Sequence, residues 1–250
     1  MTIFKHYLFR MGKHPINLAV YLLLPAIIIA INVSIGTNAI GILPEAWEGV
    51  NLNTATIVVW IMVMFQFFST SLAYDLSFDD FRTDRRWRLL AAPIALRKYM
   101  VANVASALII SIISGLVLLA VGRFVFDAYL FNIGITLGVL VISAIMAMAV
   151  GCIFFLVCSK KGTAEGLAHA VVWPQTLPLQ FLGALVNDGG PIEFLFTRAT
   201  PYAVAINAIN YSSPLAGDDM NMAFLNLGVL AAMAAVLWVV VFIISRKKAF

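Results

Sequence analysis

Charged side chains are scarce in this chain. They make up 11% of its 250 residues, whereas hydrophobic residues make up 62% and the mean hydropathy is +0.98. A soluble domain carries about 25% charged and about 45–50% apolar residues. So few polar side chains cannot cover a chain of this length in water, which excludes a soluble globular protein. The composition indicates an integral membrane protein whose solvent is lipid.

Residues that hold metals or form disulfides are also few. The two cysteines, Cys152 and Cys158, lie six positions apart on one predicted helix, about 9 Å along its axis. That separation is too long for a disulfide, so we expect both to be inert packing residues. The three histidines, His6, His14 and His169, lie in separate segments. Neither residue type forms a metal-binding signature.

A phosphate-binding loop of the form G-x-x-x-x-G-K-[ST] is missing. The only Gly-Lys pair, Gly12–Lys13, is followed by His14. The chain is therefore not expected to bind ATP through such a loop, and no other catalytic motif is present. We expect no catalytic residue, metal or cofactor in this chain, and hence not an enzyme. Any energy for transport has to come from a partner protein or an ion gradient.

Long apolar runs are what the chain has instead. A helix that crosses the hydrocarbon core needs about 20 mostly apolar residues. Six runs satisfy this, at about 16–36, 54–74, 99–121, 133–157, 164–186 and 222–244. We therefore predict an all-α integral membrane fold with six transmembrane helices in a single domain, 1–250.

Residues 187–221 are apolar in part, but they contain Glu193, Arg198 and Pro201. A charge near the middle of a lipid-facing helix costs about 2.5–3.5 kcal/mol on insertion scales. We predict short external half-helices here, between the fifth and sixth spans.

The distribution of positive charge predicts the orientation. If both termini are cytoplasmic, all of the 16 basic residues except Arg123 and Arg198 fall in cytoplasmic segments. Lysine and arginine are retained on that side of membranes, whereas a seventh span would move the basic cluster at 246–248 outside. The net charge of +4 is thus an orientation signal and gives no reason to expect a nucleic-acid partner. We predict cytoplasmic termini in a bacterial or archaeal plasma membrane.

The first 15 residues have the pattern of an amphipathic helix. Phe4, Tyr7, Leu8 and Met11 follow i, i+3, i+4, i+7 spacing, and Pro15 ends the segment. Such a helix lies in the membrane interface and does not cross it. A basic flank that only sets the topology is the alternative.

The segment 75–98, between the second and third spans, is the most charged part of the chain. Aspartates and arginines alternate in it, with Phe81 and Trp87 among them. It predicts a short cytoplasmic helix, charged on one face and aromatic on the other, which stops before Pro93. Exposed aromatic residues beside arginine are typical of protein interfaces. A helix resting on anionic lipid headgroups would have a similar composition.

The same segment permits a different chemistry. Asp75-x3-Asp79 and Asp80-x3-Asp84 place carboxylates at the spacing of one helical face, as in the Mg²⁺-dependent prenyl- and phosphatidyltransferases of membranes. Arginines are interleaved here and no second aspartate-rich cytoplasmic loop exists, which disfavours an enzyme of this kind.

Three glutamines within or beside the spans are candidates to line a transport pathway: Gln66, Gln175 and Gln180. Hydrogen bonding between neighbouring helices is the alternative role for each.

This layout resembles the type-2 permease of ATP-binding-cassette (ABC) transporters. Residues 88–93, RLLAAP, followed by Tyr99, resemble the R-L-L-A-x-P stretch of that family. Residues 200–208, TPYAVAINA, resemble its N-P-x-x-Y-A-x-x-A segment, with Thr200 in place of the asparagine. The usual Gly-Thr ahead of the R-L-L stretch is missing.

The resemblance implies roles for particular residues. The interfacial helix would be the elbow helix, and residues 78–92 would be a coupling helix that docks on a separate ATPase subunit, with Phe81 and Trp87 as apolar anchors. Its expected contact residues are Asp80, Phe81, Arg82, Asp84, Arg85, Arg86, Trp87 and Arg88. Pro201 and Tyr202 would belong to the outer gate.

The resemblance also implies partners and an activity. ATP and Mg²⁺ would be bound by the ATPase subunits, and a second permease chain, identical or related, would complete the pathway in the membrane lipid. The expected activity is export of an amphipathic or hydrophobic substrate such as a peptide, drug or lipid-like molecule. A gradient-driven transporter or membrane scaffold, and an aspartate-dependent membrane enzyme, remain alternatives.

Overall fold

The computed structural model describes residues 2–12, 21, 23–39, 52–91, 95–130, 132–176, 190, 194–213 and 219–247. Within these ranges the chain is helical and contains no strand, which confirms the all-α prediction. The elements are α1 (Thr2–Gly12), α3 (Leu24–Ala39), α4 (Leu52–Phe68), α5 (Thr70–Phe81), α6 (Arg85–Leu90), α7 (Leu96–Val125), α8 (Ile133–Val157), α9 (Lys161–Thr176), the π-helical turn η3 (Leu195–Ala199), α12 (Pro201–Tyr211) and α13 (Met220–Lys247).

Four helical segments among the described residues are long and apolar enough to cross a membrane. They are Thr54–Phe81, Arg97–Val125, Ile133–Val157 and Met220–Lys247. They coincide with four of the six spans predicted from the sequence and are consistent with an integral membrane protein. The predicted spans 16–36 and 164–186 lie partly outside the described residues. Their described parts are α3 and α9, so the number six stays a prediction.

The second span is longer than predicted. Its helix continues past residue 74 to Phe81, because Leu76, Phe78 and Phe81 are buried against neighbouring helices and extend the apolar face by two turns. The first seven residues of the predicted coupling segment 75–98 therefore belong to the helix α5. A break at Ser69 separates α4 from α5. The Ser69 hydroxyl donates to the carbonyl of Gln66, a contact that bends helices.

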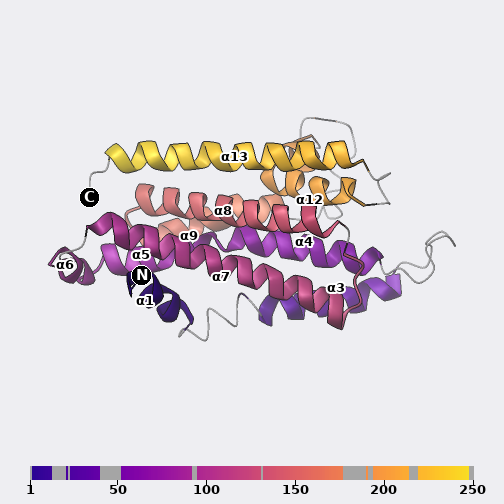
Figure 1. Cartoon of the computed structure of the whole chain (residues 1–250), viewed down its shortest axis with the longest axis horizontal. Coiled ribbons are helices and arrows are strands. Elements are labelled where there is room, and N and C mark those ends of the chain that lie inside the picture. The colour runs from indigo at the N-terminus through magenta and orange to yellow at the C-terminus, as the bar shows by residue number, and fades with distance from the viewer. Residues whose placement is uncertain are drawn as a thin grey trace.

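The helices form an elongated bundle with α8 at its centre (Figure 1). α8 contacts α4, α5, α7, α9, α12 and α13, and α12 also packs against α13 and α4. α1 lies against α7 at the end of the bundle from which α6 projects (Figure 1). The last turns of α5, α8 and α13 and the first turns of α7 and α9 lie at this same end.

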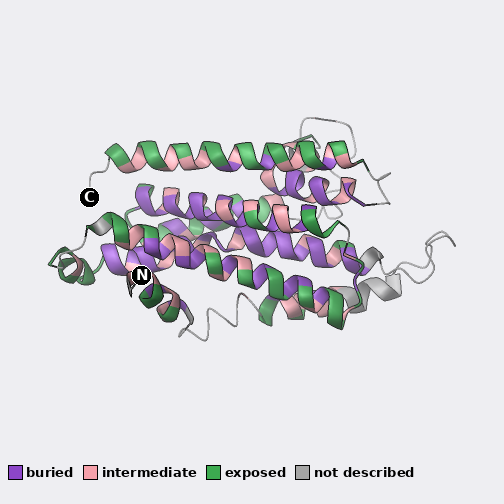
Figure 2. Ribbon diagram, in the orientation of Figure 1, coloured by how far each residue is buried: buried purple, intermediate pink, exposed green. Residues whose placement is uncertain are grey.

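Burial separates the inner helices from the outer ones (Figure 2). The most apolar window of Thr54–Phe81 is 72% buried, whereas that of Met220–Lys247 is 17% buried. The exposed side chains of α13 are nevertheless large and apolar, among them Phe224, Val236 and Phe242. An apolar exposed face of this length is suited to lipid and not to water.

Polar side chains join the inner helices. The Ser111 hydroxyl on α7 donates to Oε1 of Gln66 on α4 over 2.8 Å. The Asn103 amide, also on α7, donates to the Ser77 hydroxyl on α5 over 2.7 Å. Away from water these hydrogen bonds satisfy groups that would otherwise be unpaired, and they fix the rotation of α7 relative to α4 and α5.

At Gly151 the backbone of α8 closely approaches that of α5. A Cβ atom added at Gly151 would lie 2.5 Å from the carbonyl oxygen of Thr70 and 2.7 Å from the Cβ of Ala73. Only glycine fits there. This contact packs α5, the helix that leads into α6, tightly against the central helix α8.

Candidate functional site

The short helix α6 lies outside the bundle, at the end of the second span. The backbone N–H of Arg82 donates to the Phe78 carbonyl and closes α5, and a turn then leads into α6. None of the residues of α6 is buried, and the side chain of Trp87 is 72% exposed. An exposed tryptophan among arginines has the composition of an interface anchor.

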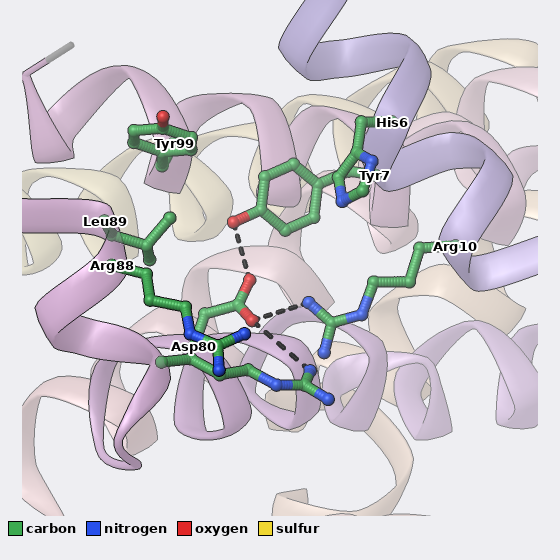
Figure 3. Close-up of a pocket in the computed structure, with 8 residues that line it drawn as sticks. His6, Tyr7, Arg10, Asp80, Arg88, Leu89 and Tyr99 are labelled. Carbon is green, nitrogen blue, oxygen red and sulfur yellow. Dashed lines mark hydrogen bonds and ion pairs between the residues drawn. The ribbon is translucent and has the colours of Figure 1, made fainter. Parts of the chain in front are cut away.

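A buried carboxylate anchors the base of this helix. Asp80, in the last turn of α5, is 5% exposed and accepts a hydrogen bond of 2.7 Å from the Tyr7 hydroxyl on α1. Arg10, one turn further along α1, donates to its other oxygen over 2.5 Å (Figure 3). Arg85 on α6 lies 3.8 Å from that same oxygen. Asp80 thus links α1, α5 and α6, and the charge-assisted contacts compensate for its burial.

The Tyr7 hydroxyl remains a hydrogen-bond donor to Asp80 because it stays protonated. Burial raises the pKa of this hydroxyl far above the usual range, and the hydrogen bond to Asp80 raises it further. Both causes favour the protonated phenol because an ionised oxygen would be desolvated beside a carboxylate. The hydroxyl therefore keeps its proton wherever the protein is folded.

Phe81 does not have the role expected from the sequence. Its ring is 2% exposed and lies 5.9 Å from the ring of Phe155 on α8, so it is part of the core and is no exposed anchor. The guanidinium of the following residue, Arg82, is stacked 5.7 Å from the same Phe155 ring. The expectation was wrong because the α5 helix extends to Phe81 and turns it towards α8.

Asp75 and Asp79 are four residues apart in α5, as the sequence predicted, whereas Asp80 and Asp84 do not share a helical face. Asp80 is in α5, whereas Asp84 follows the end of that helix and is exposed at the start of α6. Among the described residues no group of three or more histidine, cysteine, aspartate or glutamate side chains is arranged to hold a metal ion.

The short helix α6 has two different faces. Arg85, Arg88 and Leu89 line a cavity of about 420 Å³ that Tyr7, Arg10 and other residues close from the opposite side. The side chains of Arg86, Trp87 and Leu90 are exposed and do not line it. The predicted contact residues within α6 thus lie on two faces, with Arg85 and Arg88 directed at the cavity beside α1 and Arg86 and Trp87 directed away from it.

The two predicted gate residues lie at the opposite end of the bundle. Pro201 is the first residue of α12, and Thr200 caps this helix by accepting from the Ala203 N–H. The Tyr202 hydroxyl donates to the carbonyl of Trp60 over 3.2 Å, and its ring contacts Phe67 at 6.3 Å. Burial raises the pKa of this hydroxyl. Tyr202 therefore fastens α12 to α4.

The three glutamines proposed for a pathway have separate environments. Gln66 is 1% exposed and hydrogen-bonded to Ser111 on α7. These bonds match the alternative role, hydrogen bonding between neighbouring helices. Gln175 donates to the Val171 carbonyl of its own helix over 2.7 Å. Gln180 lies outside the described residues.

A second cavity, of about 360 Å³, lies between α3, the α4–α5 segment and α9. Its walls are largely aromatic, with Phe65, Phe68 and Trp173 among them, and Asp75 and Glu165 are at its charged end. Asp75 forms an ion pair of 3.3 Å with Lys161. The sequence placed Asp75 in the cytoplasmic segment. It gave no indication that Asp75 lines a cavity together with residues of α9.

The chain matches no protein-family model, and no curated protein is significantly similar to it in sequence.

Proposed function

We propose that this chain is the transmembrane permease subunit of an ATP-driven exporter of the ABC type-2 class, which uses a separate ATPase subunit. The observation that carries this proposal is the outward face of α6. Arg86, Trp87 and Leu90 are exposed on a helix that stands outside the bundle and is connected at its base, through Arg85 and Asp80, to α5.

The connection at Asp80 suits α6 to transmit force. A displacement of α6 by a docked ATPase subunit would act on Asp80 through Arg85, and from there on the α5 helix and α1. Gly151 keeps α5 in close contact with the central helix α8. Movement of α6 would therefore shift the spans as a rigid body, the way in which domain motions are usually transmitted.

The distribution of basic residues supports cytoplasmic termini. Among the described residues, those at the α6 end of the bundle are Lys5, Arg10, Arg82, Arg85, Arg86, Arg88, Arg97, Lys98, Lys160, Lys161, Arg246 and Lys247. Arg123 and Arg198 are at the opposite end. This asymmetry favours a cytoplasmic location for α6, where an ATPase would meet it, in a bacterial or archaeal plasma membrane.

The second cavity supports a route for an amphipathic substrate. It borders the second span and the start of the predicted fifth span, and its aromatic walls suit an apolar molecule. A second permease chain, identical or related, would complete the route, and α12 with Pro201 and Tyr202 would form part of its outer gate.

Co-purification tests the proposal. The chain is expressed with candidate ATPase subunits, sought first among the neighbouring reading frames, and the complex is isolated through a tag on the permease. Trp87→Ala and Arg86→Glu are expected to abolish recovery of the ATPase while membrane insertion persists. Lys247→Glu, an equal charge change at the same end but on α13, is the matched control. Unchanged recovery with both α6 variants would refute docking through this face.

A gradient-driven transporter is the second candidate, because titratable groups meet at the second cavity. Asp75, Glu165 and His169 line it, and Lys161 is paired with Asp75. Proton-coupled transport needs such groups within reach of the substrate. Transport in vesicles distinguishes the two: an exporter requires ATP and the ATPase subunit, whereas this alternative requires only an imposed gradient.

A further inference from the structure

The cavity between α1, α6 and the start of α7 carries a net positive charge. Arg10, Arg85 and Arg88 line it, and the one carboxylate among the lining residues is Asp80 (Figure 3). The charge of these four side chains leaves an excess of two positive charges at neutral pH, which falls to one when Asp79, 3.8 Å from Arg10, is counted with them. A partly enclosed space with such an excess attracts anions, since the low-dielectric walls strengthen the field inside it.

Hydrogen-bond donors remain available in this cavity. A guanidinium group carries five N–H donors, and Asp80 is already bound by Tyr7 and Arg10. Arg85 is 3.8 Å from Asp80, too far for a hydrogen bond. Arg88 has no ion-pair partner within the part of the chain that the structure describes. Arg85 and Arg88 can therefore bind the oxygens of a phosphate group, whose geometry suits the forked donors of a guanidinium.

The rest of the lining is apolar and lies at the membrane boundary. The rings of Tyr7 and Tyr99 and the side chain of Leu89 form the wall beside the arginines. Asp80 belongs to the last turn of one membrane-spanning helix and Tyr99 to the first turn of the next. The cavity is thus at the depth of lipid headgroups, next to α1, whose composition is that of an interfacial helix.

We propose that this cavity binds the phosphate headgroup of an anionic phospholipid from the leaflet on the α6 side. The arginines hold the phosphate, and the apolar wall receives the glycerol and the first acyl carbons. A bound lipid bridges Arg10 of α1 and Arg88 of α6, so it stabilises the packing of the two helices. Basic cavities at this depth are suited to anionic headgroups. The site uses the α1-directed face of α6 and is independent of any protein bound to the other face.

Lipid binding to the purified full chain in detergent tests this site. The probes are dioleoyl-phosphatidylglycerol, dioleoyl-phosphatidylcholine and inorganic phosphate. Native mass spectrometry measures their binding, and the thermal unfolding midpoint measures the stabilisation that each one gives. The wild-type chain is expected to retain phosphatidylglycerol in preference to phosphatidylcholine. Arg88→Gln is expected to weaken phosphatidylglycerol binding about fivefold, the effect of one basic residue near a lipid surface.

The matched control is Arg86→Gln, the same change on the outward face of the same six-residue helix. It is expected to leave phosphatidylglycerol binding unchanged, and Arg88→Lys is expected to retain most of it. If Arg88→Gln and Arg86→Gln weaken phosphatidylglycerol binding equally, the lipid is attracted by the general positive charge of the surface and the proposed site is wrong. Inorganic phosphate that stabilises the chain as well as the lipid does would overturn the lipid assignment. Neither outcome depends on an ATPase subunit.

Discussion

The hydroxyl of Tyr7 donates a hydrogen bond of 2.7 Å to Oδ2 of Asp80, 73 residues further along the chain. This contact attaches the N-terminal helix α1 to the last turn of α5, directly before the exposed helix α6. Both partners are buried, Tyr7 at 2% and Asp80 at 5% exposure. Their contact is a structural link between α1, which the sequence predicts to lie in the membrane interface, and the segment that we propose to dock an ATPase.

Replacing Tyr7 by phenylalanine removes one donor from this link. One oxygen of the buried Asp80 carboxylate would lose its partner, which costs about 1–3 kcal/mol of unfolding free energy. The expected result is a lower thermal midpoint of the purified chain in detergent. Tyr99→Phe is the control, because within the described residues the Tyr99 hydroxyl makes no hydrogen bond. If the two variants have the same midpoint, the Tyr7 contact contributes nothing.

The elevated pKa of Tyr7 predicts a pH dependence. At neutral pH the hydroxyl is protonated in the folded and the unfolded chain, so the raised pKa has no effect there. Above the ordinary tyrosine pKa of about 10, only the unfolded chain releases this proton. The folded state then loses about 1.4 kcal/mol per pH unit relative to Tyr7→Phe. The difference in thermal midpoint between wild type and Tyr7→Phe should therefore shrink above pH 10. A constant difference across that range would contradict the burial of this hydroxyl.

Asp80→Asn should destabilise the chain far more than Asp79→Asn. Removing one partner of a buried ion pair costs about 3–5 kcal/mol, and the lower end applies here because Arg10 is partly exposed. Asp79 is about half exposed and lies 3.8 Å from Arg10, so its loss should cost less than about 1 kcal/mol. Limited proteolysis should also release α1 earlier in Asp80→Asn. Equal stability of the two variants would show that Asp80 is not the anchor.

Gly151→Ala tests the close approach of α8 to α5. The added methyl group would overlap the backbone carbonyl of Thr70, and overpacking of this kind costs about 1–3 kcal/mol. Gly228→Ala is the control in another span, where nothing lies within 4 Å of an added Cβ atom. That variant should be neutral or slightly stabilised, since alanine favours helices. Thermal unfolding of both variants measures the difference.

The proposed orientation predicts the accessibility of two engineered cysteines. In a background with Cys152 and Cys158 replaced by alanine, Thr83→Cys should react with an impermeant maleimide only after the cells are opened. Asp219→Cys, exposed before α13 at the other end of the bundle, should react in intact cells. The reverse pattern would place α6 outside and exclude docking of a cytoplasmic ATPase.

The spans were the part of the fold that the sequence predicted best. Hydrophobicity along 133–157 and 222–244 is a sum over contiguous residues, so it needs no knowledge of neighbouring helices. The end of the second span was misplaced at residue 74. Asp75, Asp79 and Asp80 look like the end of a membrane helix, but Tyr7, Arg10 and Lys161 supply partners that keep this helix going to Phe81.

The candidate site was predicted only in part. Trp87 and the neighbouring Arg86 were predicted as contact residues because aromatic and charged residues together stand out in so apolar a chain. Tyr7 was seen only as part of an amphipathic face and Arg10 as a basic flank. Their common partner is 73 and 70 positions away, a separation at which local patterns carry no information.

By itself, the sequence determined that this chain is helical, that its long helices are apolar enough to cross a membrane and that its basic residues cluster in a few segments between the apolar runs. These properties follow from composition and from the charge of successive segments. Tertiary structure alone decided which side of α6 is turned towards α1, that Phe81 is buried and that Asp80 has three partners. Those outcomes depend on how helices rotate and pack against one another, and packing is determined by contacts between residues far apart in the chain.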